Sequence, residues 1–131
     1  MGGGINALDS AIKNGISANL AGGTHHAHYD YGSGYCIFND IAIAAKYCKN
    51  KYEEYQNILV LDLDVHQGDG SATMLKGVES VFTFSIHCGG NFPLKKQKSD
   101  LDVELEKGTG YEEYMEILQE NLNELRSIQF D

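Results

Sequence analysis

Residues 58 to 63, ILVLDL, form a near-continuous apolar run, and this run constrains the fold more than any other feature. A run of this kind is typical of a strand in a parallel sheet that is covered on both faces. Parallel strands need crossover connections, and helical patterns flank the run at residues 39 to 52 and at 70 to 76. A second strand is predicted at 81 to 87, and a half-exposed one at 101 to 105. Strands that alternate with helices indicate an α/β fold with a parallel sheet flanked by helices.

Three further segments complete the predicted organisation. Residues 5 to 14 predict a helix, and residues 16 to 23 a short strand that runs into a glycine turn. Residues 22 to 36 predict a long functional loop, since linkers rarely hold three histidines and three tyrosines. Thr109 and Glu112 form a capping-box pattern for a last helix. Its inner face is predicted to carry Tyr111, Tyr114, Leu118, Leu122 and Leu125.

The charge and cysteine content exclude several classes of protein. Ten Lys plus Arg against 19 Asp plus Glu give a net charge of -9, which argues against direct nucleic-acid binding and against binding to acidic membranes. No apolar run approaches the roughly 20 residues that span a bilayer, and we expect no secretory signal. The widely spaced Cys36, Cys48 and Cys88 fit free thiols, so we expect a cytoplasmic protein. The oligomeric state stays open.

The apolar run ends in three ionisable residues spaced two apart, Asp62, Asp64 and His66. Along a strand such residues point to one side, and ligands of open α/β sheets bind outside the carboxyl ends of the strands. Carboxylates with an imidazole suit Zn²⁺, Fe²⁺ or Mn²⁺ better than Ca²⁺. The same pattern also fits aspartates that only cap the next turn. Burying two unpaired carboxylates among apolar neighbours would be costly, however, which favours a cation.

The adjacent His25 and His26 lie in the glycine-flanked loop. They fit metal ligands, an acid/base pair or exposed bystanders, because histidine exchanges protons near pH 7. Next to an acidic strand the acid/base interpretation gains weight, since a carboxylate can orient each ring and raise its basicity. Asp62 and Asp69 are the candidates for that role.

Loop aromatics are the remaining candidates. Tyr35 and Phe92 lie beside glycine or proline, where they either cover the core or border a site, and Gly34 allows the backbone to approach a ligand closely. His28 and His87 fit structural positions, and no role is assigned to them.

Three segments together resemble the histone deacetylase family, which includes bacterial deacetylase-like proteins and acetylpolyamine amidohydrolases. The segments are GGTHHAHYDYGSGYCIFND, VLDLDVHQGDG and FSIHCGGNFP, and their order and spacing match over most of residues 20 to 95. Gln67 and the later LDVELEKGTGYEEY stretch are similar to class IV-like members. The resemblance implies an arginase/deacetylase-type α/β fold, present here as the central part of a domain over residues 1 to 131. It also implies a catalytic Zn²⁺ with Asp64 and His66 as two of its ligands.

The resemblance implies an activity as well. His25 and His26 match the family's paired general acid/base histidines, with Asp62 behind His25 and Asp69 behind His26. One histidine would take a proton from the attacking water, and a protonated histidine would donate to the leaving amine. The expected substrate is acetyl-lysine in a protein, or an acetylated small amine, and the products are acetate and a free amine.

Further roles follow from the same resemblance. Gly34 matches a backbone contact to the substrate, and Tyr35 and Phe92 match the walls of a narrow acyl-lysine channel. A structural monovalent cation, K⁺ or Na⁺, is implied as well. Its ligands would be the side chains of Asp62 and Ser85 and the main-chain oxygens of Asp64, His66 and Ile86.

Two parts of the family's pattern have no counterpart in these 131 residues. They are an aspartate that is the third zinc ligand and a tyrosine that stabilises the oxyanion, and both are expected beyond Asp131. We therefore expect the isolated chain to be inactive or nearly so, and poorly stable because its sheet is incomplete. Two alternatives remain: a non-catalytic or metal-binding module of this fold, and an arginase-type manganese ureohydrolase, whose ligand spacing the QGDG stretch does not supply.

Overall fold

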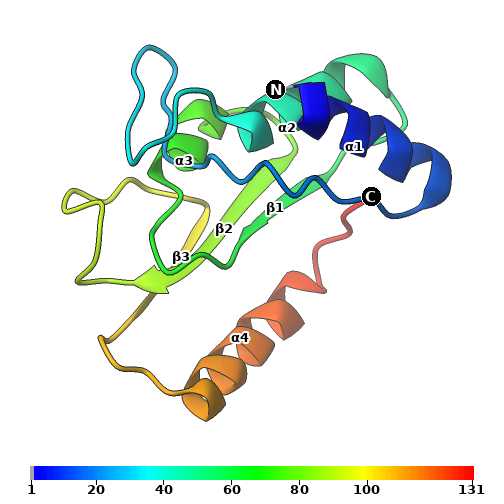
Figure 1. The fold of residues 1–131 in the computed structure, drawn as a ribbon. Helices are drawn as coiled ribbons and strands as arrows, with labels where there is room; N and C mark the ends of the chain where they lie inside the picture. The colour runs from blue at the N-terminus through cyan, green and yellow to red at the C-terminus, as the bar shows by residue number, and fades with distance from the viewer. Residues whose placement is uncertain (1) are drawn as a thin grey trace.

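A three-stranded parallel sheet forms the centre of the computed structural model, which describes residues 2–131 (Figure 1). The strands are β1 (Ile58–Asp62), β2 (Val81–Cys88) and β3 (Leu101–Leu105), in the order β1-β2-β3. Both pairs of neighbours are parallel, and Asp62 at the end of β1 lies beside Ser85 of β2. The parallel α/β sheet predicted from the sequence is confirmed.

Helices cover both faces of this sheet, as Figure 1 shows. Helices α1 (Gly2–Asn14), α2 (Asp40–Lys51) and α3 (Asp69–Leu75) lie on one side, where α1 packs against α2 and α3 forms the crossover from β1 to β2. Helix α4 (Tyr111–Leu125) lies on the other side. No helix of the described residues is long and apolar enough to cross a membrane.

Two apolar clusters hold these layers together. On the side of α2 and α3, the cluster consists of Ala42, Ala45, Val60, Leu75 and Val81. On the side of α4, it consists of Phe84, Ile86, Leu118 and Leu125. Strand β2 contributes to both clusters and is buried along most of its length, including its polar residues Thr83, Ser85 and His87.

Asn39 connects the start of α2 to the loop that precedes it. Its side-chain oxygen accepts a hydrogen bond from the backbone N–H of Ala42 and so caps the helix. Its amide nitrogen, which is fully buried, donates to the backbone oxygens of His25 and Ala27 and to Ser71 Oγ. One side chain therefore fixes α2, the histidine loop and α3 relative to one another.

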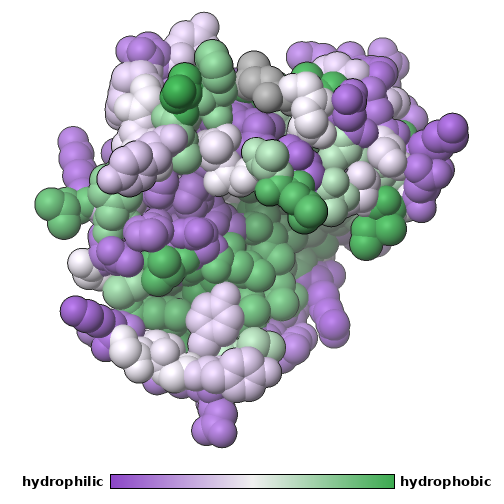
Figure 2. Space-filling view, viewed as in Figure 1, coloured by the Kyte–Doolittle hydropathy of each residue, from purple (hydrophilic) through white to green (hydrophobic). Residues whose placement is uncertain are grey.

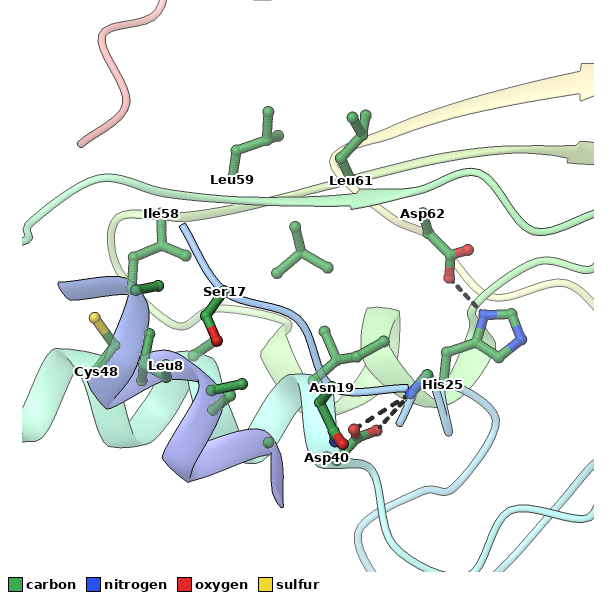
Figure 3. Close-up of a pocket in the computed structure, with 18 of the residues that line it drawn as sticks. Leu8, Ser17, Asn19, His25, Asp40, Cys48, Ile58, Leu59, Leu61 and Asp62 are labelled. Carbon is green, nitrogen blue, oxygen red and sulfur yellow. Dashed lines mark hydrogen bonds and ion pairs between the residues drawn. The ribbon is translucent and has the colours of Figure 1, made fainter. Parts of the chain in front are cut away.

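Strand β1 is less covered than its apolar sequence predicts. Leu59 and Leu61 point away from α1 and α2 (Figure 3), and Leu61 and the following Leu63 are 40% and 45% exposed. Among the described residues β1 pairs with β2 alone, so its other edge is open. Figure 2 shows a broad apolar surface across the middle of this side of the molecule. The prediction that residues 58 to 63 form a strand covered on both faces is therefore wrong at Leu61 and Leu63, and β2 is the strand that is buried along most of its length.

Two other predictions of local structure are also wrong. Residues 16 to 23 form no strand, because no described strand lies beside them to pair with, and Leu20 is fully exposed. Helix α4 begins without a capping box: its N-cap is Gly110, and the hydroxyl of Thr109 donates back to the oxygen of Glu106. Tyr111 is 78% exposed, so it does not share the inner face of α4.

Candidate active site

A pocket of about 680 Å³ lies at the carboxyl end of β1, between the histidine loop and the segment that carries Phe92. Its lining consists of Gly23, His25, His26, Gly34, Tyr35, Cys36, Asp64, His66 and Phe92. All of these except Gly23 and Cys36 are site residues that the sequence predicts. The structure therefore brings together in one cavity residues that are up to 69 positions apart in the chain (from Gly23 to Phe92).

His25 is oriented by Asp62, the last residue of β1. Its Nδ1 lies 2.5 Å from Asp62 Oδ2, and Figure 3 shows this carboxylate directed at the ring. The His25 side chain is 8% exposed. Burial alone would lower the pKa of His25, but the hydrogen bond to Asp62 and the negative charges of Asp62, Asp64 and Asp69 raise it above the usual value. His25 is thus suited to carry a proton near neutral pH.

His26 is oriented in the same way by Asp69, the first residue of α3. Its Nδ1 lies 2.7 Å from Asp69 Oδ1, and both side chains are almost completely buried. Because an ionised carboxylate only accepts hydrogen bonds, Nδ1 of His26 carries the proton and Nε2 is left to accept one. The ring of His26 lies 4.1 Å from that of His25, between centroids.

The close approach of the histidine loop to α3 depends on a glycine. A Cβ at Gly70 would overlap the backbone of His26 and Ala27. The backbone N–H of Ser71 also donates to the oxygen of His25, at 2.9 Å. The sequence GDG at the start of α3 therefore supplies a carboxylate for His26 and, one residue later, the space that the loop needs.

Asp64 and His66 lie beyond the end of β1, in the bend that follows it, and not within the strand as their spacing predicts. The backbone N–H of His66 donates to Asp64 Oδ1, and His66 Nδ1 lies 2.9 Å from the same oxygen. Partial burial would raise the pKa of Asp64, but these hydrogen bonds and the charges of His25 and His66 lower it. The carboxylate is therefore ionised, as a metal ligand must be.

The donor types of this pair fit zinc, since carboxylate oxygen and imidazole nitrogen are both common zinc ligands. The number of donors is smaller than a catalytic zinc site requires. Catalytic zinc sites have three protein ligands, and within residues 2–131 no group of three or more His, Cys, Asp or Glu side chains is gathered to hold a metal. Asp64 and His66 thus place two donors on the wall of the pocket, one fewer than a catalytic zinc site has.

The other pocket residues differ in how closely they border the histidines. Phe92 packs edge-on against His26, with 4.9 Å between ring centroids, and is 38% exposed. Gly34 has a positive φ of 51°, and a Cβ there would overlap the ring of His26. Tyr35 is fully exposed, so its ring borders only the mouth of the pocket.

Ser85 and Ile86 lie in the interior of β2 and do not line the pocket. Both are almost completely buried, and Ser85 Oγ lies 3.0 Å from Nδ1 of His87. Ser85 neighbours Asp62 across the sheet, so two of the oxygens expected at a monovalent cation come from adjacent strands.

Two residues with buried side chains, His28 and Gln67, received no role from their sequence patterns. His28 Nε2 lies 3.2 Å from Asp69 Oδ2, on the carboxylate that also binds His26. Gln67 is 1% exposed; its Nε2 donates to the oxygen of Gln97 and to Asp102 Oδ1, and its Oε1 accepts from the N–H of Gln97. These contacts join residues at least 30 positions apart, so no spacing rule reveals them. The only sequence signal is the third histidine in HHAH.

Known proteins that are similar to this chain fall in one group. The family model of the histone deacetylase domain matches residues 1–129. An uncharacterised protein of Picosynechococcus sp. is 48% identical over 127 residues, which cover 97% of this chain and 42% of that protein. The acetoin utilization protein AcuC of Staphylococcus aureus is 42% identical over 93 residues, which cover 69% of this chain and 23% of that protein.

Solved structures agree with these sequence matches. An HDAC homolog from Aquifex aeolicus superposes with a TM-score of 0.84 at 25% identity, over 98% of this chain and 37% of that one. A structure of an HDAC homolog complexed with SAHA superposes with the same score and the same coverage. This chain therefore spans less than half the length of each of these relatives.

Proposed function

Because the chain belongs to the histone deacetylase family, a family of hydrolases with the arginase/deacetylase-type fold, we propose that it is part of a zinc-dependent deacetylase. The reaction is hydrolysis of the amide of acetyl-lysine, or of a related acylated amine, with release of acetate. One observation carries the proposal: two imidazoles, each bonded to its own aspartate, face a pocket whose wall bears Asp64 and His66. We also propose that residues 1–131 are the central part of a larger catalytic domain.

Asp64 and His66 are the proposed zinc ligands of this chain, and the third ligand comes from the rest of the full-length protein. Zinc, when bound, polarises the amide carbonyl and makes water a stronger nucleophile at neutral pH. The ionised state of Asp64 supports the assignment, as does the presence of both donors in the lining of one pocket.

His25 and His26 are the proposed acid/base pair. Nδ1 of His26 is held in its protonated form by Asp69, so Nε2 can take the proton of the attacking water. His25 is favoured as a cation by Asp62, so it can donate a proton to the departing amine. Asp69 thus favours His26 as the general base, and Asp62 favours His25 as the general acid.

The substrate's acyl-lysine chain is proposed to lie along Phe92, with the backbone of Gly34 opposite and Tyr35 at the mouth. The aromatic face of Phe92 next to His26 supports this placement. A solved relative complexed with SAHA is consistent with a ligand-binding pocket in this fold.

A monovalent cation, K⁺ or Na⁺, is proposed beneath the pocket. Asp62 and Ser85 would contribute side-chain oxygens, and Asp64, His66 and Ile86 main-chain oxygens. The adjacency of Asp62 and Ser85 on neighbouring strands supports this site. Asp62 would then hold both His25 and the cation, so its loss would affect both.

The competing candidate is a non-catalytic metal-binding module, which is favoured by the presence of only two zinc donors in the described residues. The test compares the full-length protein with the 131-residue chain on an acetyl-lysine peptide and on an acetylpolyamine, with acetate as the readout. We expect turnover by the full-length protein that a chelator abolishes and Zn²⁺ restores, and little or none by the isolated chain. Stoichiometric zinc in the full-length protein with no turnover of either substrate would support the competing candidate instead.

A further inference from the structure

Asp69 binds two imidazoles, and the proposed reaction uses only one of them. Its Oδ1 lies 2.7 Å from Nδ1 of His26, and its Oδ2 lies 3.2 Å from Nε2 of His28. The side chains of Asp69 and His28 are 6% and 7% exposed, so solvent does little to orient this carboxylate. The orientation of Asp69 is therefore set by the groups that hydrogen-bond to it.

The hydrogen-bonding partners of His28 indicate which of its ring nitrogens carries a proton. The ionised carboxylate of Asp69 accepts hydrogen bonds only, so Nε2 of His28 carries a proton and donates. On the opposite side of the ring, Nδ1 lies 2.8 Å from Thr73 Oγ1. The same hydroxyl donates to the backbone oxygen of Gly70, at 3.0 Å, so Thr73 is itself held by α3.

The ring of His28 is held in this position by its surroundings. It stacks on Tyr31, with 4.3 Å between centroids and 16° between planes. Thr73 belongs to α3, the helix that Asp69 begins, so both hydrogen-bonding partners of His28 come from one rigid element. His28 therefore ties the histidine loop to α3 two residues after His26 does so.

We propose that His28 is a positioning residue, which holds Asp69 in the rotation that keeps Nδ1 of His26 protonated and Nε2 directed to the pocket. This inference rests on the proposed function, because it assigns His28 to the acid/base machinery of that same site. His28 touches neither substrate nor metal; it acts through Asp69 and His26.

The test uses two variants of the full-length protein that separate hydrogen bonding from packing. His28→Phe keeps the ring that stacks on Tyr31 and removes the donor to Asp69. His28→Gln loses the ring but places an amide N–H near the position of Nε2. We expect His28→Phe to lower kcat by about 10-fold or more, with KM changed less than about 2-fold, as for other partners that orient a functional group. His28→Gln should recover most of this loss.

A second readout does not depend on turnover. In the NMR spectrum the Nδ1 proton of His26, assigned by its absence in His26→Ala, should exchange faster with water in His28→Phe and stay protected in His28→Gln. If the full-length protein had no deacetylase activity, the proposed function would fail while this measurement would still decide the role of His28. The proposal is overturned if His28→Phe leaves the Nδ1 proton as protected as in the wild type. It is also overturned if His28→Gln is impaired more than His28→Phe, since packing would then be what matters.

Discussion

The paired imidazoles of His25 and His26 are each oriented by a carboxylate, and a different element supplies each carboxylate. Asp62 ends β1 and orients His25, whereas Asp69 begins α3 and orients His26. The two histidines are adjacent in sequence, so a single short loop delivers both rings, while the sheet and the helix determine what each ring can do. A substitution that moves the ring of His26 by even a fraction of an ångström should therefore lower the rate of the reaction.

Gly34 is a residue at which a substitution can displace the ring of His26 without removing a polar side chain. Because Gly34 has a φ of 51°, Gly34→Ala would strain the backbone. Because a Cβ there would overlap the ring of His26, the substitution would also displace that ring. We expect a loss of about 1–2 kcal/mol in the free energy of unfolding from the backbone strain, and a fall in kcat of about 10-fold or more from the displaced ring. Chemical denaturation and steady-state kinetics measure the two effects.

Gly90→Ala is the matched control, because Gly90 has no positive φ and a Cβ there would meet no atom within 4 Å. Both quantities should stay at wild-type values in this variant. Wild-type kinetics in Gly34→Ala would contradict this prediction, because they would show that the ring of His26 accommodates the added methyl group.

The loops around the pocket are fixed to the sheet and helices at single buried or half-buried side chains. Gln67 holds the segment that follows Phe92, through hydrogen bonds to Gln97 and Asp102. Asp40, the first residue of α2, holds the base of the histidine loop by accepting hydrogen bonds from Gly23 and Thr24. Each loop therefore depends on one side chain of a regular element or its flank.

Gln67→Ala should loosen the segment that carries Phe92. The backbone of Gln97 and the carboxylate of Asp102 would lose their partner, which typically costs about 1–3 kcal/mol for a buried polar group. We expect a higher KM for an acetyl-lysine peptide with a smaller change in kcat, because the wall moves more than the histidines do. Gln119→Ala on the exposed face of α4, where the amide bonds only to Asn123, should change neither parameter. An unchanged KM in Gln67→Ala would mean that Phe92 is held by other contacts.

The carboxylate of Asp40 is expected to make the free energy of unfolding fall at acid pH. Partial burial would raise its pKa, but the hydrogen bonds from the hydroxyl and N–H of Thr24 and from the N–H of Gly23 lower it overall. Because the folded pKa is below the unfolded one, Asp40 stabilises the fold above about pH 4 and loses this effect as the pH falls through its folded pKa. The free energy of unfolding should thus fall less between pH 7 and pH 3 in Asp40→Asn than in the wild type. Parallel pH curves for the two proteins would refute this.

For the whole molecule, apolar periodicity was sufficient to predict the parallel sheet. The residues that line the pocket were predicted largely from the resemblance of three motifs to the histone deacetylase family. The errors arise where structure depends on a partner distant in sequence. Residues 16 to 23 have a strand-like pattern but no neighbouring strand, and the apolar face of β1 that carries Leu59 and Leu61 is covered only in part. The contacts of His28 and Gln67 are of the same kind, because they join segments that only the folded chain brings together.

The central claim is that Asp64 and His66 form part of a zinc site in the full-length protein. The direct measurement is the zinc content of the purified full-length protein and of its Asp64→Ala, His66→Ala and Glu116→Gln variants, the last being a carboxylate change on exposed α4. We predict one zinc per chain in the wild type and in Glu116→Gln, and none in Asp64→Ala or His66→Ala. Full zinc occupancy in either of these two variants would contradict the ligand assignment and the function built on it.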